Sequence, residues 1–316
     1  MNTTSPAATR IEYLESNHFD GKTEHAPKIK PWQLRVAQFL FSTFGSVSPQ
    51  YMARLAYKIF ATPRHRAKHR QPDDLIRAAK VIDLPFDGHI VKLYEWEKEP
   101  DAPIILLAHG WESRGTALRM FVKPLLNKGF KVVAFDALAH GDSDGSTNNL
   151  LTNARTIAAI HAHYGNIYGA IGHSFGCSSL VYAQQFVNNA IDFQRLVFLA
   201  VPHRTKRIMD GFLAYMNAPN AVKKAFFHYI ESLTKQPIET SDTALAYPSV
   251  KVGQLLLIHD QDDDVTSIDA AERVVEHWDN ALLLVTKGYG HFRIAKNPDV
   301  IRRIVDFLEM TKNEDF

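Results

Sequence analysis

The stretch that decides the fold of this chain is Gly172-His173-Ser174-Phe175-Gly176. An apolar run of strand length, residues 166–171, precedes it, and an apolar helical segment, residues 177–188, follows it. This pattern predicts a strand that turns sharply into a helix and presents Ser174 at the turn. Glycine is expected on both sides because the serine backbone is strained and larger side chains would collide across the turn. A hydroxyl held in this way is a candidate nucleophile.

Outward from this turn, strands and helices alternate from about residue 81 onward. Continuous apolar runs such as Ile104–Ala108 are typical of parallel strands that are buried on both faces. The alternation predicts a doubly wound α/β fold with a mostly parallel eight-stranded sheet, helices on both faces, and function at the carboxyl ends of the strands. The predicted strands are residues 81–84, 90–96, 104–109, 131–136, 167–172, 196–200, 254–259 and 281–286. The predicted helices are residues 114–127, 149–164, 175–188, 267–277 and 298–310.

The chain divides into three parts. Residues 1–80 are predicted to form a polar tail, two apolar helices (32–44 and a second after Pro49) and a basic cluster between Arg64 and Arg70. Residues 81–202 and 248–316 are predicted to form the α/β core. Residues 203–247 lack a convincing strand, and we expect them to form a helical cap over the site.

The apolar and basic N-terminal segment has two interpretations. The helices can pack on the core with their charges solvated, or residues 32–70 can make a weak contact with an anionic membrane surface.

Composition narrows the class of protein. The chain has 316 residues, of which 46% are hydrophobic and 22% are charged, and this suits a globular protein with a sizeable core. A net charge of +2 argues against nucleic-acid binding. Cys177 is the single cysteine, so no intramolecular disulfide forms. Residues 1–10 lack a signal-peptide pattern and no apolar run is long enough to cross a bilayer, so we expect a soluble cytoplasmic protein.

A serine nucleophile requires a general base, and the base requires an acid that orients it. Downstream of Ser174, one predicted strand ends at His259 and leads into Asp260-Gln-Asp-Asp-Asp-Val265. The last predicted strand leads into a glycine-rich turn that carries His291. Both segments follow strand ends, where an acid and an imidazole can converge on the serine.

In this order, these stretches resemble the α/β-hydrolase superfamily, in its serine hydrolase and esterase-like branch, over roughly residues 81–316. The matching stretches are His109-Gly110-Trp111, Asp136-Ala-Leu-Ala-His140-Gly-Asp-Ser143, the serine turn, the acidic turn and Gly290-His291. The resemblance implies an α/β-hydrolase fold in which Ser174 is the nucleophile, His291 the general base and Asp263 the acid. The chain departs from the family pattern in having Asp260 where a glycine is usual, so Asp262 stays an alternative acid.

An oxyanion hole is expected from two backbone N–H groups, because attack on a carbonyl places negative charge on its oxygen. One donor should be Phe175, at the start of the helix after the nucleophile. The other should be Trp111, in the loop after the strand that ends at His109, and the Trp111 indole is expected to form a pocket wall. His109 and His140 are expected to hydrogen-bond loop backbone rather than act in catalysis.

The predicted function is a serine hydrolase that cleaves a carboxylic ester, a thioester or a related acyl bond of a small molecule through an acyl-enzyme on Ser174. No cofactor and no metal are expected. Asp260, Asp262 and Asp264 have the spacing of a calcium loop, but its glycine and its glutamate are missing. Two alternatives stay open: an acyltransferase with the same triad, and a non-catalytic binding protein of the same fold.

Overall fold

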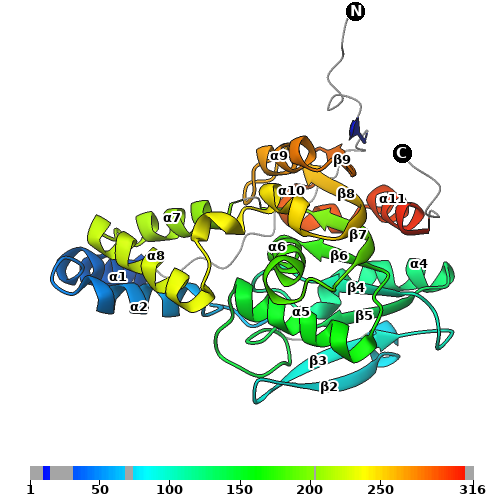
Figure 1. Ribbon diagram of the computed structural model, residues 1–316, viewed down its shortest axis with the longest axis horizontal. Coiled ribbons are helices and arrows are strands. Elements are labelled where there is room, and N and C mark those ends of the chain that lie inside the picture. Colours follow the sequence, from blue (N-terminus) through cyan, green and yellow to red (C-terminus); the bar gives the residue numbers. More distant parts are fainter. Residues whose placement is uncertain (1–9, 15–30, 68–73, 203, 310–316) are drawn as a thin grey trace, which may run out of the picture.

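The structure is a computed structural model that describes residues 10–14, 31–67, 74–202 and 204–309. Within these residues the centre is a nine-stranded sheet with the order β1-β9-β8-β7-β6-β4-β5-β3-β2 (Figure 1). The strands from β1 to β5 in this order are parallel, and β3 and β2 are antiparallel at one edge. The strands are β1 (Ile11–Tyr13), β2 (Lys80–Phe86), β3 (His89–Trp96), β4 (Ile104–Ala108), β5 (Lys131–Phe135), β6 (Gly169–His173), β7 (Phe193–Leu199), β8 (Val252–Asp260) and β9 (Ala281–Thr286).

The eight strands predicted from the sequence correspond to β2 through β9. The structure adds β1, which lies in the segment predicted as a tail and pairs in parallel with β9, with Ile11 opposite Leu283. A three-residue strand carries no periodicity of its own. It forms because the open edge of β9 offers unpaired backbone groups.

Helices cover both faces of the sheet, as predicted. Successive residues of β4 alternate between two apolar cores, with Leu106 in one and Ile105 in the other. The first core lies under α5 (Leu150–Tyr164), α6 (Phe175–Tyr182, continued by a π-helical turn Ala183–Val187) and α9 (Asp269–His277). The second lies under the 3₁₀ helix η2 (Gly115–Phe121), α4 (Val122–Asn127) and α11 (Pro298–Glu309). Two short helices, α3 (Asp74–Arg77) and α10 (Gly290–Arg293), complete this part.

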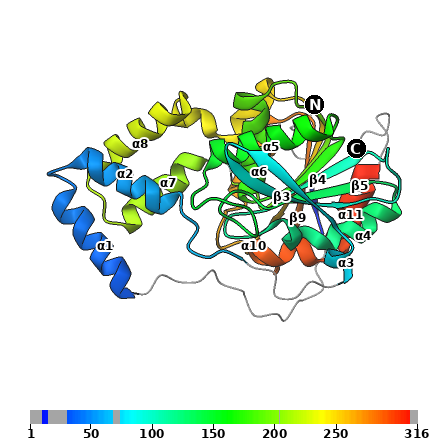
Figure 2. The ribbon, with the colours of Figure 1, turned by 90° about the horizontal axis from the view of Figure 1, so that it is seen from below.

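A separate layer of helices lies to one side of the sheet (Figures 1 and 2). It consists of α1 (Pro31–Phe44), α2 (Pro49–Phe60), α7 (Thr205–Tyr215) and α8 (Asn220–Thr234), and we call these four helices the cap. The cap has its own apolar core, in which Phe41, Ala53, Leu213 and Phe226 are buried. The 3₁₀ helices η4 (Ile238–Ser241) and η5 (Thr243–Ser249) lead back to β8.

The cap is therefore built from two segments that are far apart in the sequence. The sequence predicted a helical cap from residues 203–247, and the N-terminal helices α1 and α2 complete it. Among the described helices, none combines the length and the apolar character that crossing a membrane requires.

Candidate active site

Ser174 lies at a sharp turn between β6 and α6. Its backbone angles are φ 51° and ψ −117°, a strained conformation for a residue with a side chain. The two flanking glycines are required sterically. A Cβ on Gly172 would lie 2.9 Å from the backbone of Cys177, and a Cβ on Gly176 would lie 2.2 Å from the carbonyl oxygen of Ala108. The turn therefore presses the start of α6 against the end of β4.

Asp263 and His291 meet at the carboxyl ends of β8 and β9. The Nδ1 atom of His291 lies 2.8 Å from Oδ2 of Asp263, and both side chains are buried. Because a carboxylate only accepts hydrogen bonds, this contact assigns the proton to Nδ1 and leaves Nε2 as a proton acceptor. The pair therefore has the tautomer that a general base requires.

Asp263 is held by a full set of donors. Its carboxylate accepts hydrogen bonds from the backbone N–H groups of Val265 and Thr266, each at 2.8 Å, and from the Thr266 hydroxyl at 2.9 Å. Burial by itself raises the pKa of Asp263, but the hydrogen bond and the charge interaction with His291, together with the two backbone donors, outweigh it. The net result is an Asp263 pKa below its ordinary value, so the carboxylate is charged at neutral pH.

The neighbouring carboxylates have different surroundings. Asp262 is exposed, whereas Asp260 is fully buried and accepts hydrogen bonds from the backbone N–H groups of Tyr289 and Gly290 at 3.1 and 2.9 Å. Asp260 also accepts from the backbone N–H of Asp262 at 3.0 Å. Asp260, which stands where the family usually has a glycine, thus joins the acidic turn (residues 260–265) to the turn that carries His291. Of the two candidate acids, the structure brings Asp263 to His291.

His173 connects this pair to the serine turn. Its Nε2–H donates to the backbone carbonyl of His291 at 2.9 Å, and the two imidazole rings lie 4.9 Å apart between centroids. Because His173 precedes Ser174 in the chain, the hydrogen bond fixes the backbone of His291 beside the turn that carries Ser174.

The backbone N–H groups of Phe175 and Trp111 lie on the two segments that the turn presses together. Phe175 is the first residue of α6, so its N–H has no acceptor within the helix. The side chains of Trp111 and Phe175 make an edge contact, with ring centroids 5.4 Å apart. The loop that carries Trp111 approaches closely, because a Cβ on Gly110 would lie 2.8 Å from Nδ1 of His173.

His109 determines how the Gly110–Trp111 peptide is oriented. Its Nε2 accepts from the N–H of Ala137 at 3.0 Å, and its Nδ1–H donates to the carbonyl of Gly110 at 2.7 Å. In a trans peptide the C=O and the following N–H point in opposite directions. Holding the Gly110 carbonyl on one side therefore directs the Trp111 N–H to the other.

His140 supports the same loop, and both histidines are neutral. Its Nε2 accepts from the N–H of Glu112 at 3.1 Å and its Nδ1–H donates to the carbonyl of Leu138 at 2.9 Å. Burial lowers the pKa of His109, of His140 and of His173 to about 4 in each case, and for His173 the nearby His291 adds to the effect. The prediction that His109 and His140 hydrogen-bond loop backbone is confirmed.

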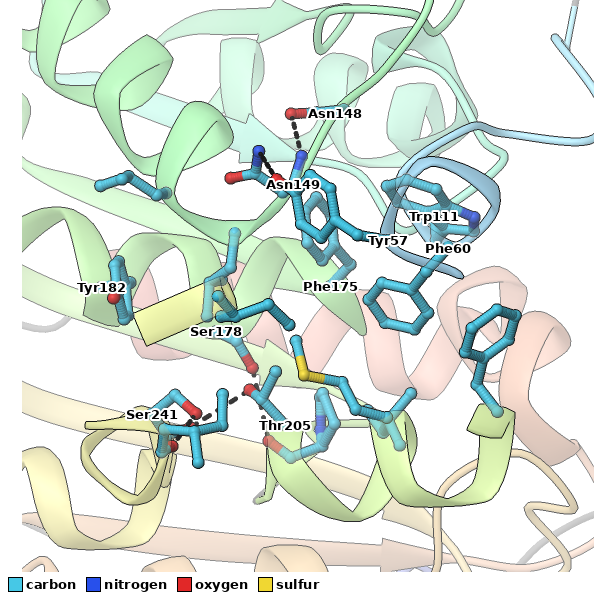
Figure 3. Close-up of a pocket in the computed structure, with 18 of the residues that line it drawn as sticks. Tyr57, Phe60, Trp111, Asn148, Asn149, Phe175, Ser178, Tyr182, Thr205 and Ser241 are labelled. Atoms are coloured by element: carbon cyan, nitrogen blue, oxygen red, sulfur yellow. Dashed lines mark hydrogen bonds between the residues drawn. The ribbon is translucent and has the colours of Figure 1, made fainter. Parts of the chain in front are cut away.

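A cavity of about 630 Å³ opens at Ser174. Trp111 and Phe175 line it at the serine, and Tyr57 and Phe60 of α2 lie beside them (Figure 3). The remaining wall is largely apolar and comes from the cap and from α5 and α6. It includes Leu150, Leu151, Tyr182, Met209, Phe212, Met216 and Ile230.

Polar groups form the smaller part of the cavity surface, and Asn148 and Asn149 are among them. Ser178, Thr205 and Ser241 lie together on one side (Figure 3). Near Trp111, the guanidinium of Arg64 pairs with the carboxylate of Glu112, with Nε 3.1 Å from Oε1. A substrate in this cavity would meet mainly apolar side chains. In the described part of the chain, no cluster of three or more His, Cys, Asp or Glu side chains is arranged to hold a metal ion.

Sequence reasoning missed three contributors to the site. Thr266 hydrogen-bonds Asp263, and its hydroxyl lies 3.2 Å from Nδ1 of His291. Tyr57 and Phe60 bring the N-terminal segment into the cavity wall. The apolar spacing of residues 49–60 predicted a helix with one buried face, but spacing does not identify what that face packs against.

Solved structures of other proteins share the fold of this chain. Solved structures with the same fold include a bacterial membrane phospholipase A, which is 16% identical, with 90% of this chain and 97% of that chain covered and a TM-score of 0.58. An esterase from Pyrococcus furiosus is 22% identical, with coverage of 78% and 96% and a TM-score of 0.55. A thioesterase domain from the curacin biosynthetic pathway is 17% identical, with coverage of 74% and 100% and a TM-score of 0.54.

At these identities the likeness shows the fold alone, and no curated protein matches in sequence. The family model of the alpha/beta hydrolases, however, matches residues 105–304, which is more than half of the chain and includes Ser174, Asp263 and His291. The chain therefore belongs to the alpha/beta hydrolase family.

Proposed function

We propose that the protein is a serine hydrolase that cleaves carboxylic esters, or related acyl bonds, of substrates with an apolar acyl chain. The observation that carries the proposal is the 2.8 Å contact between Asp263 and His291, with the His291 backbone tied to His173 next to Ser174. Ser174 itself lines an apolar cavity. The solved neighbours are named as a phospholipase, an esterase and a thioesterase domain, and these names share acyl-bond hydrolysis.

In the first half of the reaction the Ser174 hydroxyl attacks the acyl carbonyl carbon. Nε2 of His291 accepts the hydroxyl proton, and Asp263 stabilises the resulting imidazolium through Nδ1–H. The negative charge that develops on the carbonyl oxygen is stabilised by the N–H groups of Phe175 and Trp111. The imidazolium then donates its proton to the leaving alkoxide or thiolate, and the acyl group stays on Ser174.

In the second half His291 removes a proton from water, which attacks the acyl-enzyme. The same two N–H groups stabilise the second tetrahedral intermediate. Collapse of this intermediate returns the proton to Ser174 and releases the carboxylic acid.

The cavity wall indicates the substrate class. Its aromatic and aliphatic side chains favour an acyl chain of several carbons over an acetyl group. Each CH₂ group that moves from water into such a wall contributes about 0.8 kcal/mol. Two additional CH₂ groups can therefore raise kcat/KM by up to about tenfold while the chain still fits.

The test is a series of p-nitrophenyl esters from acetate to palmitate, assayed with the wild-type protein and with Ser174→Ala. We expect kcat/KM to rise with chain length, to level off when the cavity is full, and to fall to background for all esters in the variant. Activity that survives Ser174→Ala would contradict the proposal. So would the absence of hydrolysis of every ester by folded wild-type protein, which would favour a binding protein.

An acyltransferase with the same triad would form the same acyl-enzyme. Products distinguish the two functions when a candidate alcohol or amine acceptor is added. A hydrolase releases mainly the free acid, whereas a transferase gives mainly the acylated acceptor.

A further inference from the structure

The outer face of α1 carries a row of exposed, large apolar side chains: Trp32, Val36, Phe39, Leu40 and Phe44. Their spacing of four, three, one and four residues places them on one side of the helix. Phe39 is 64% exposed, and Leu40, the least exposed of the five, is 37% exposed. We call these five residues the α1 stripe. A contiguous apolar surface of this kind is unusual on a monomer and marks an interaction site.

The opposite face of α1 is occupied by the rest of the cap. Phe41 is buried in the cap core, and Leu34 and Ala37 pack against it. Nε2 of Gln38 donates to the backbone carbonyl of Tyr215 on α7 at 2.9 Å. α1 is also the helix at the end of the molecule farthest from the sheet (Figure 2). Within the described residues, no other element covers the α1 stripe.

The segment that carries the α1 stripe has charges of one sign. Residues 31–67 contain no Asp or Glu, and they contain Arg35, Arg54, Lys58, Arg64 and Arg66. Arg35, Arg54 and Lys58 are exposed, whereas Arg64 pairs with Glu112. An apolar helix face on a segment whose charges are all positive matches an anionic lipid surface. A second copy of this chain fits less well, because docking the same face would bring like charges together.

We infer that the α1 stripe inserts into the interface of an anionic bilayer, with Arg35, Arg54 and Lys58 against the lipid headgroups. The helix lies in the interface and does not cross the membrane, since α1 has 14 residues.

The position of the α1 stripe also determines how far the bilayer lies from the opening of the cavity. Ile208 and Tyr215 line the cavity and are 48% and 49% exposed, and the Tyr215 carbonyl is the group that holds Gln38 of α1. The rim of the cavity therefore meets α1 on the side opposite the α1 stripe, one helix diameter (~10 Å) from the bound surface. A lipid acyl chain that leaves the bilayer has that distance to cross before it reaches the cavity, and this last step rests on the proposed function.

The test measures vesicle binding by the full chain carrying Ser174→Ala, so that binding is scored without hydrolysis. Vesicles of phosphatidylcholine with one-third phosphatidylglycerol are compared with vesicles of phosphatidylcholine alone. We expect cosedimentation with the anionic vesicles that weakens at high salt. The change Trp32→Ser with Phe39→Ser should weaken it at least tenfold. Replacing Arg35, Arg54 and Lys58 by Gln should weaken it by about fivefold per charge.

A matched control removes two exposed aromatic or aliphatic side chains elsewhere. Tyr13 and Val81 are 70% and 56% exposed on β1 and β2, and Tyr13→Ser with Val81→Ser should leave binding unchanged. Thermal unfolding checks that every variant folds. No binding to anionic vesicles, binding that the stripe variant leaves intact, or a stripe-dependent dimer in place of binding would each overturn the inference. None of these results depends on whether Ser174 is catalytic.

Discussion

Asp263 is the residue through which the proposed base acquires its orientation. It accepts from Nδ1 of His291, while the Thr266 hydroxyl and two backbone N–H groups hold its carboxylate in place. Without that carboxylate, the imidazole would lose both the preferred tautomer and the partner of its positive charge. Asp262, one residue earlier, is exposed and supplies the natural control.

At this scale we predict that Asp263→Asn lowers kcat by about three to four orders of magnitude, because the amide no longer fixes the Nδ1–H tautomer or stabilises the imidazolium. Asp262→Asn should leave kcat within about twofold of wild type. Steady-state hydrolysis of a p-nitrophenyl ester by both variants is the measurement. Equal losses in the two variants would contradict the assignment.

The limits of sequence reasoning are also seen at single residues. The order of serine, acid and histidine follows from motifs at strand ends, and so do the glycines around Ser174. Among the four carboxylates of residues 260–264, Asp263 could not be separated from Asp262, because the choice depends on which of them the turn directs inward. Only three-dimensional packing shows that Asp260 is used for the backbone of the His291 turn and that Asp263 faces the imidazole.

Among the elements, α2 connects the cap to the core and to the cavity. The hydroxyl of Tyr57 accepts from Nδ2 of Asn149, and Oδ1 of the same Asn149 caps the start of α5. Phe60 packs against Phe212 and Phe226, with ring centroids 5.2 and 6.3 Å away, and also lines the cavity. The α2 helix is thus a structural part of the acyl pocket that we propose.

For this element we predict that Phe60→Ala lowers kcat/KM for a p-nitrophenyl octanoate roughly tenfold, since the longer chain loses apolar contact. The acetate ester does not reach this wall and should change by no more than about twofold. Tyr51→Ala, on the exposed side of α2, is the matched control. If Phe60→Ala reduced the rates of both esters equally, Phe60 would have no part in acyl-chain recognition.

The strands and helices whose position follows from a local sequence pattern were predicted well. Apolar runs and helical spacing located β2–β9 and the helices of the core, because burial on both faces leaves a continuous pattern. The association of α1 and α2 with α7 and α8 was not predicted, because it joins segments more than 140 residues apart. Such contacts depend on where the chain returns in space, and one sequence does not encode that in any local pattern.

On the scale of the whole molecule, buried histidines make the fold sensitive to acid, because burial lowers the pKa of His109, His140, His173 and His259. His109, His140 and His173 have a pKa of about 4, whereas an exposed histidine titrates near 6.5. Between these values the unfolded chain binds more protons than the folded protein. The stability that depends on the neutral form is therefore complete above about pH 6.5 and is lost as the pH falls toward 4.

We predict that the free energy of unfolding in urea decreases between pH 7 and pH 5, and that His109, His140 and His173 together contribute a slope of up to about 4 kcal/mol per pH unit near pH 5. His109→Gln should reduce this slope by up to about 1.4 kcal/mol per pH unit, because one of these groups is removed. His163→Gln, at an exposed position, should leave the slope unchanged. Stability that is constant from pH 7 to pH 5 would contradict the neutral, buried state of these histidines.

The central claim concerns the whole site, namely that the fold activates Ser174 as a nucleophile. A fluorophosphonate reacts covalently with such a serine, and mass spectrometry of the digested protein identifies the modified residue. We predict a single adduct on Ser174 in the wild type, a strongly slowed reaction in Asp263→Asn, and no adduct in Ser174→Ala. An adduct on another residue, or no adduct on folded protein that hydrolyses esters, would contradict the account.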